Sequence, residues 1–125
     1  MAARVLIADD EPCITDVVSR KLRKEGFEVI VAADGQEAYE LAMAERPDFI
    51  ITDLQMPRMS GLELCVRLAA ELAEPVPILM LTAKGFELDP AEIARLPILA
   101  VMTKPFSPRE LRDKVCQALQ DLRAP

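Results

Sequence analysis

Short apolar runs alternate with amphipathic stretches five times along this chain. The runs are rich in β-branched side chains, which is typical of buried strands, and they cover residues 4–8, 27–31, 49–52, 76–81 and 98–102. Apolar strands that are separated by helices form parallel sheets covered on both faces. With right-handed crossovers, the sequence predicts a doubly wound, three-layer α/β sandwich of five strands and five helices.

Residues typical of helix ends mark the predicted helices. Pro12 suits the first turn of the first helix, and Gly26 suits its C-terminal stop. Two pairs have capping-box spacing: Asp34 with Glu37, in a helix that runs to about Glu45, and Ser60 with Glu63. The last helix begins at Ser107, Pro108 and Glu110, and its inward residues are expected to be Leu111, Val115, Ala118 and Leu122.

Length, composition and charge narrow the class of protein. At 125 residues, 51% of them apolar, we expect one domain over residues 1–125 with its core in about residues 4–122. The net charge of −6 argues against direct binding of nucleic acid or an anionic membrane. The longest apolar runs are far shorter than the roughly 20 residues of a membrane span, and the start lacks a signal-peptide pattern. The three cysteines, odd in number and widely spaced, favour reduced thiols in a cytoplasmic protein: Cys13, Cys65 and Cys116.

Polar side chains follow four of the predicted strands. Residues 9–11 are Asp-Asp-Glu after the first strand, Asp53 follows the third, Thr82 the fourth and Lys104 the fifth. In doubly wound sheets the chemistry lies at the carboxyl ends of the strands. Each residue taken alone is more often a solvated turn, a helix cap or a surface lysine, but their joint placement at one edge is much harder to obtain by accident.

The chemistry expected of this edge is phosphoryl transfer. Clustered carboxylates raise one another's pKa values, and a divalent cation relieves the repulsion. Oxygen ligands without histidine, which the chain lacks, suit Mg²⁺. An aspartate can attack phosphorus, and the transfer needs mainly alignment and charge neutralisation. Mg²⁺ and Lys104 would neutralise the phosphoryl oxygens, and the Thr82 hydroxyl would donate a hydrogen bond to one of them.

Four motifs resemble those of the response regulator receiver family of two-component signal transduction: Ile7–Glu11, Asp53–Leu64, Leu81–Lys84 and Thr103–Phe106. The resemblance runs from Arg4 to about Leu122 and implies the CheY-like, flavodoxin-like sandwich with strand order 2-1-3-4-5. It implies that Asp53 is the phosphoacceptor and that Thr82 and Lys104 hold the phosphoryl group. It also implies the Mg²⁺ ligands: Asp10, Asp53 and the backbone carbonyl of Gln55 directly, and Asp9 through water.

The same resemblance implies a switch and its partners. The Lys104–Pro105 bond would be cis, and Pro57 and Gly61 would shape the loop after Asp53, the glycine through its permissive backbone. A sensor histidine kinase or a histidine phosphotransfer protein would supply the phosphoryl group. The surface of the fourth helix, fifth strand and fifth helix would then bind a downstream protein or a second copy of the chain. The chain would be no enzyme beyond its own phosphorylation and dephosphorylation.

The sequence departs from the family in the last third of the chain. Val101 stands three residues before the lysine, where the family has Tyr or Phe, so the common aromatic switch cannot operate. Residues 85–100, bracketed by Pro90 and Pro97, predict a short or irregular fourth helix, and apolar residues there, with Phe86, belong either to the core or to a partner surface. Lys84 is expected to lengthen the life of the phosphorylated state, which Lys84→Ala would then shorten.

Three other readings remain at this point. A haloacid-dehalogenase-like phosphatase also uses a nucleophilic aspartate, but it needs a second acid two residues later, where Gln55 stands, and its nucleophile ends the first strand. A flavodoxin-like nucleotide or flavin module needs a Gly- or Ser/Thr-rich phosphate loop after the first strand, where Asp-Asp-Glu-Pro stands. A degenerate receiver would never be phosphorylated and would act only as an interaction surface, a reading that Val101 keeps open.

Overall fold

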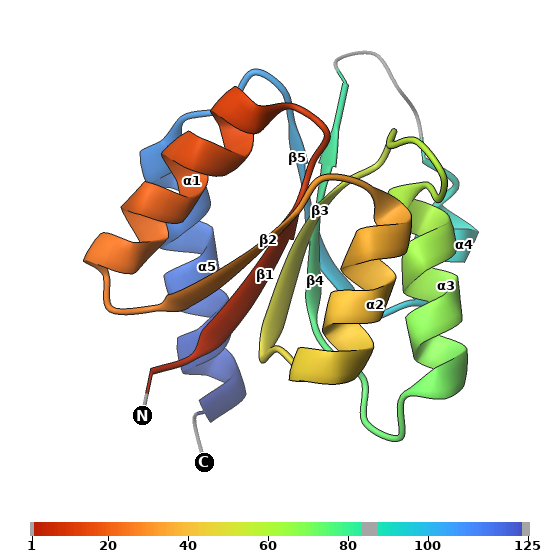
Figure 1. Ribbon diagram of the computed structural model, residues 1–125. Helices are drawn as coiled ribbons and strands as arrows, with labels where there is room; N and C mark the ends of the chain where they lie inside the picture. Colours follow the sequence, from red (N-terminus) through yellow and green to blue (C-terminus); the bar gives the residue numbers. More distant parts are fainter. Residues whose placement is uncertain (1, 84–87, 124–125) are drawn as a thin grey trace.

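The computed structural model describes residues 2–83 and 88–123, and for residues 122 and 123 only the helical backbone. Strands and helices alternate along the chain (Figure 1) in the order β1 Arg4–Ala8, α1 Pro12–Lys24, β2 Glu28–Ala32, α2 Gly35–Glu45, β3 Phe49–Asp53, α3 Gly61–Glu71, β4 Ile78–Thr82, α4 Pro90–Ala94, β5 Ile98–Thr103 and α5 Pro108–Arg123. Three expectations fall outside the described residues or side chains: those for Lys84, Phe86 and the inward side chain of Leu122.

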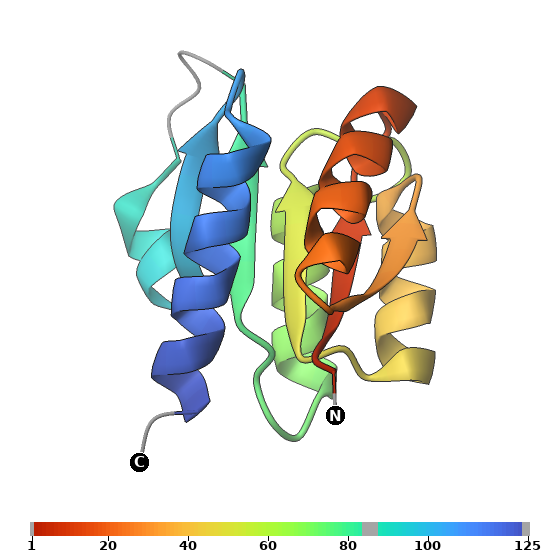
Figure 2. The same cartoon turned by 90° about the vertical axis from the view of Figure 1, so that its left-hand side faces the viewer.

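The five strands form one parallel sheet in the order β2-β1-β3-β4-β5. Helices α1 and α5 cover one face, and α2, α3 and α4 cover the other (Figures 1 and 2). The predicted doubly wound sandwich and its strand order are therefore confirmed. No helix in the described part of the chain is both long enough and apolar enough to cross a bilayer.

Two apolar cores, one on each face of the sheet, hold the layers together. Alternate residues of β1 and β3 point to opposite faces, so Ile7 and Ile51 pack under α1 and α5, and Leu6 and Ile50 pack under α2 and α3. All four side chains are fully buried. This central pair of strands carries the acids of the predicted site, so the site stands on the most buried part of the molecule.

The helix ends follow the predicted chemistry. The Asp34 carboxylate accepts a hydrogen bond from the Glu37 backbone N–H at 2.8 Å, and Glu37 in turn accepts one from the Ala33 N–H at 2.6 Å. The Ser60 hydroxyl caps α3 by accepting from the Glu63 N–H at 3.1 Å. In α5, Leu111 and Val115 are buried as expected and Ala118 is half-buried. Leu119, which was not expected to be buried, is only 5% exposed.

Prolines delay the start of β4, and a bulge adds one residue to β5. Strand β4 begins at Ile78, two residues later than predicted, because Pro75 and Pro77 flank Val76 and Pro77 has no N–H to donate to a sheet. In β5 the register passes from Ile98 to Ala100 against consecutive residues of β4, so Leu99 is the extra residue and is 52% exposed.

Helix α4 is the least anchored helix of the fold. It has five residues, none of them buried, and the Asp89 side chain caps it by accepting from the Ala91 N–H at 3.0 Å. The predicted short fourth helix is therefore confirmed. On the neighbouring strand β5, Val101 faces the α4 side of the sheet beside the fully buried Met80, yet it is 39% exposed because α4 is too short to cover it.

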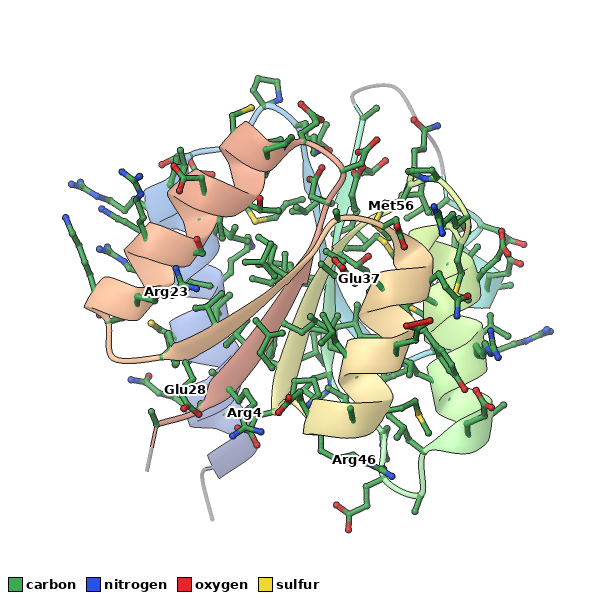
Figure 3. All side chains as sticks on the ribbon, viewed as in Figure 1. Arg4, Arg23, Glu28, Glu37, Arg46 and Met56 are labelled. Atoms are coloured by element: carbon green, nitrogen blue, oxygen red, sulfur yellow. The ribbon has the colours of Figure 1, made fainter. Side chains whose placement is uncertain are left out.

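A charged cluster lies at the amino ends of the strands, opposite the edge that carries the predicted site. Arg4 donates through its side chain to the Glu45 backbone carbonyl at 2.8 Å and pairs with Glu28 at 3.3 Å, and its backbone N–H donates to Asp48 at 2.8 Å. Arg4 and Glu28 lie at the end of the strands away from Met56, which belongs to the loop after β3 (Figure 3). Through these contacts the cluster links the amino ends of β1 and β2 to the residues around the end of α2, and it is separate from the predicted site.

Candidate functional site

Three carboxylates meet at the carboxyl edge of the central strands. Asp9 and Asp10 follow β1, Asp53 is the last residue of β3, and the two strands pair directly, with Ala8 opposite Thr52. One oxygen from each of the three carboxylates lies within 4.8 Å of the others. Asp9 and Asp53 are only 1% and 6% exposed, whereas Asp10 is exposed. The acids that the sequence separates by more than forty residues therefore form one cluster.

Lys104 reaches this cluster from the end of β5. Its Nζ atom lies 2.9 Å from Asp9 Oδ2, 3.0 Å from Glu11 Oε1 and 3.3 Å from Asp53 Oδ1. Its backbone N–H donates to the Thr82 carbonyl at 2.8 Å, which ties the lysine to the end of β4, and the Lys104–Pro105 bond is cis as the resemblance implied. Sequence reasoning gave Glu11 no role, although it directly follows the two aspartates and accepts a hydrogen bond from Lys104.

The placement of Thr82 is only partly as expected. It ends β4, one residue beyond the partner of Asp53 in the sheet register, and it is 3% exposed. Its hydroxyl hydrogen-bonds the Ala83 carbonyl at 3.3 Å. Thr82 therefore stands at the edge of the cluster, with its hydroxyl bonded to the backbone, and its role in holding a phosphoryl group stays a prediction.

Burial makes the charges of the cluster costly. It raises the pKa of Asp53 to about 6, helped by the negative charge of Asp9 and opposed by the Lys104 ammonium. Burial also raises the pKa of Asp9, against the lowering effect of Lys104. Burial alone would lower the pKa of Lys104, but the carboxylates of Asp9 and Glu11 outweigh it and raise that pKa. The lysine is firmly protonated and still leaves the cluster with excess negative charge.

The carboxylate cluster is compatible with Mg²⁺. Asp9 Oδ2 is buried and accepts no hydrogen bond of good geometry, although the Lys104 amine lies 2.9 Å away. A buried oxygen of this kind, with two further carboxylates within reach, is the donor set that a hard cation prefers. Gln55, the predicted carbonyl ligand, is exposed and lines the same pocket as Asp10, which has a volume of about 690 Å³.

The loop after Asp53 is held by close backbone packing. The Gly61 N–H donates to the Leu54 carbonyl at 2.8 Å, and a Cβ on Gly61 would overlap the carbonyl oxygen of Asp53 and lie 3.0 Å from Met80 Sδ. The expectation that Gly61 serves through its permissive backbone is therefore wrong: its φ is ordinary, and the loop needs the missing side chain. The left-handed residue in this loop is Arg58, with φ 71°, and Met59 N–H donates back to the Pro57 carbonyl at 2.8 Å.

A second hollow, of about 590 Å³, adjoins the cluster on its other side. It lies between α1 and the β5–α5 loop and includes Lys104 and Glu11 at its inner end. Cys13, Val17 and Phe106 contribute much of its wall, and Val17 is 47% exposed. The three cysteines are free thiols, as expected, and only Cys65 is buried.

The family model for the response regulator receiver domain matches residues 5–116. The chain belongs to the response regulator receiver family. It is 41% identical over 115 residues to the alkaline phosphatase synthesis transcriptional regulatory protein PhoP of Bacillus subtilis (strain 168), a match that covers 92% of this chain and 48% of PhoP. The chain thus spans about half the length of that curated relative.

Solved receiver domains have the same fold. The REC domain of AraT, a response regulator of Geobacillus stearothermophilus, is 33% identical with a TM-score of 0.84, and the match covers 98% of this chain and 96% of that one. The chemotaxis response regulator CheY4 of Vibrio cholerae is 36% identical with a TM-score of 0.81, over 94% and 98% of the two chains. Membership of the receiver family leaves the phosphatase and flavodoxin readings without support.

Proposed function

We propose that this receiver domain is a phosphorylation-dependent switch that accepts a phosphoryl group on Asp53 in the presence of Mg²⁺. The observation that carries the proposal is the convergence of Asp9, Asp10, Asp53 and Lys104 in one cluster at the carboxyl edge of the sheet. A purely structural ion pair would not need three carboxylates around one buried position, because the excess charge is costly. Family membership supports the same chemistry.

The proposed phosphoryl donor is a phosphohistidine on a sensor kinase or a phosphotransfer protein, which membership of the receiver family supports. An oxygen of the Asp53 carboxylate forms a bond to phosphorus while the phosphorus–nitrogen bond breaks, and its electron pair returns to the imidazole. Asp10, Asp53 and the Gln55 carbonyl would hold Mg²⁺ directly and Asp9 would hold it through water, and the bound metal would supply positive charge that neutralises the phosphoryl oxygens.

Lys104 and Thr82 complete the site. The Lys104 ammonium, 3.3 Å from Asp53 Oδ1 and fixed by Asp9 and Glu11, contacts a phosphoryl oxygen from the side of β5. The Thr82 hydroxyl turns from the Ala83 carbonyl to the phosphoryl group, which draws the end of β4 toward Asp53. The donor protein docks in the hollow between α1 and the β5–α5 loop, whose inner end is Lys104.

The signal leaves through the surface of α4, β5 and α5, which binds a downstream protein or a second copy of the chain more strongly in one state than in the other. The chain catalyses only its own phosphorylation and dephosphorylation and works in the cytoplasm. None of the α4 residues is buried, which supports the proposal that this surface can move. Because the exposed Val101 stands where the family has an aromatic side chain, the switch must operate without that side chain.

The test is phosphorylation by a small donor. The protein is incubated with Mg²⁺ and acetyl phosphate, and its intact mass is measured. Wild type should gain one phosphoryl group, Asp53→Asn should gain none, and Asp16→Asn, which changes an exposed acid of α1, should load like wild type. Chelation of the metal should abolish loading. An unmodified wild type would favour the degenerate receiver. The Thr82–Ala83 hydrogen bond and the presence of Val101 are consistent with that alternative.

A further inference from the structure

A continuous groove runs from the phosphoacceptor cluster along the flank of α3. The pocket of about 690 Å³ that contains Asp10 and Gln55 shares Ser60, Leu62 and Glu92 with a second hollow of about 600 Å³ farther along α3. We call this surface the α3–α4 groove and define it by Leu62, Val66, Ala70, Leu88, Asp89 and Glu92. None of the described residues that line it belongs to β5 or α5, so it meets the α4–β5–α5 surface only at α4.

The floor and one wall of the groove are apolar. Leu62, Val66 and Ala70 are spaced by four residues, so they form one stripe along α3. Val66 is 54% exposed, and Leu62 and Leu88 are half-buried. Because α4 has five residues and α3 has eleven, α4 can cover only part of this stripe, and Val66 stays exposed.

The rim of the groove is acidic. Among the residues that the structure describes, it carries one guanidinium, that of Arg67, and four carboxylates, those of Asp10, Glu63, Asp89 and Glu92. Arg67 is already engaged, because its Nε atom lies 3.3 Å from Glu71 and its guanidinium stacks 3.9 Å from the ring centre of Tyr39. Among the described residues, Glu63 and Glu92 enter no ion pair.

We propose that the α3–α4 groove docks an amphipathic helix of a partner protein, with apolar residues on one face and Lys or Arg on its flanks. The apolar stripe with a spacing of four is the counterpart of a helix face in helix-in-groove recognition. The acidic rim selects basic flanks by charge complementarity and excludes acidic ones. The proposal deepens the proposed function, because it names the chemistry of a partner that binds beside Asp53.

The probe is a fluorescently labelled synthetic helix of Leu and Lys, with its Leu residues on one face, and a counterpart in which Glu replaces Lys. Binding to the full, unphosphorylated chain is followed by fluorescence anisotropy. The Lys peptide should bind at least about tenfold more tightly than the Glu peptide, and added salt should weaken it. Backbone NMR shifts on binding should concentrate at Leu62, Val66 and Glu92.

Matched variants separate docking from general attraction to an acidic protein. Val66→Lys and Glu92→Lys should each weaken binding about tenfold. Val31→Lys changes a valine on β2 that is 40% exposed, against 54% for Val66, and Glu74→Lys changes the net charge by the same amount as Glu92→Lys. Both control variants should bind like wild type. Equal losses in all four variants, or no loss in Val66→Lys, would overturn the proposal. Because no phosphoryl group is present in this test, its failure would leave the phosphorylation of Asp53 standing, and the reverse also holds.

Discussion

Helices α1 and α5 on one face of the sheet are anchored very differently from α4 on the other face. On one face, α1 and α5 bury Val18, Leu22, Leu111 and Val115 almost completely, in helices of 13 and 16 residues. On the other face, α4 has five residues and buries none of them. The site lies between these two regions, with Lys104 on the loop that leads into α5 and the α3–α4 groove beside α4.

The difference in burial indicates which part of the molecule can move. Close-packed interiors resist displacement, so the side with α1 and α5 fixes the distances of Lys104 to Asp9 and Asp53. Elements with few buried contacts open at low cost in free energy, so the α4 side is where a new charge on Asp53 can alter the surface. The site geometry is thus fixed by the packing of α1 and α5, and the surface that can move is that of α4.

The largest expected effect tests this contrast in packing. Leu111→Ala, in the fully buried part of α5, should lower the free energy of unfolding by about 2–5 kcal/mol, because it leaves a cavity that the core cannot refill. Leu96→Ala removes the same atoms from a half-buried residue just after α4 and should cost about 1 kcal/mol. Urea denaturation measures both. Equal costs would mean that the α4 side is as firmly packed as the α5 side.

The second effect concerns the charge that the rigid side holds in place. Because the pKa of Asp53 is raised from 3.8 to about 6 in the folded protein, the folded state binds a proton more tightly than the unfolded state. Without Mg²⁺, wild type should therefore lose about 2–3 kcal/mol of stability relative to Asp53→Asn as the pH rises from about 4 to above 6.

The sign of the stability difference between wild type and Asp53→Asn is what tests the raised pKa of Asp53. Below the unfolded-state pKa the two proteins should be equally stable, and at pH 7.5 Asp53→Asn should be the more stable one. Added Mg²⁺ should narrow the gap, because it binds the folded wild type through Asp53. Thermal unfolding across the pH range measures this, with Glu74→Gln, a change at an exposed residue, as the control. A wild type more stable than Asp53→Asn at pH 7.5 without metal would contradict it.

A third test asks whether close packing also fixes the loop after Asp53. Gly61→Ala should cost about 1–3 kcal/mol, because the new Cβ overlaps the Asp53 carbonyl and the fully buried Met80 cannot yield. It should also slow phosphorylation by acetyl phosphate. Gly26→Ala is the matched control: its φ of 94° strains any side chain by about 1–2 kcal/mol, but no atom lies within 4 Å of the new Cβ. Its phosphorylation rate should equal that of wild type.

The sequence predicts most of the fold because the signals for its elements are local. Each capping pair lies within one helical turn, and each buried strand is a continuous apolar run, so both could be read from neighbouring residues. The errors arise where local signals conflict, as at Val76 between two prolines, or where an extra residue is absorbed by a bulge, as at Leu99.

The site is predictable for a different reason, and the contacts that were not predicted in it depend on tertiary structure. A parallel sheet brings the carboxyl ends of all its strands to one edge, so the meeting of Asp9, Asp53 and Lys104 follows from topology. The pairing of Lys104 with Glu11 joins residues 93 positions apart and needs side-chain directions that no local pattern gives. The contact between Gly61 and the Asp53 carbonyl is likewise a matter of loop geometry.

The smallest expected effect separates electrostatics from movement on the α4 side. Phosphorylation adds about −1.5 to −2 charges beside the acidic rim of the α3–α4 groove, so it should strengthen binding of the Leu/Lys helix. At roughly 10 Å in water, with screening at physiological salt, such a charge contributes only a few tenths of a kcal/mol per lysine, or about a twofold gain in affinity. Because α4 is so lightly anchored, we expect more, about tenfold, since a shift of α4 would reshape the groove as well as charge it. Anisotropy titrations of wild type with and without acetyl phosphate in Mg²⁺, with Asp53→Asn as the control, give the ratio. A gain of only twofold would mean that α4 stays in place and is as rigid as α1 and α5 in the signalling step.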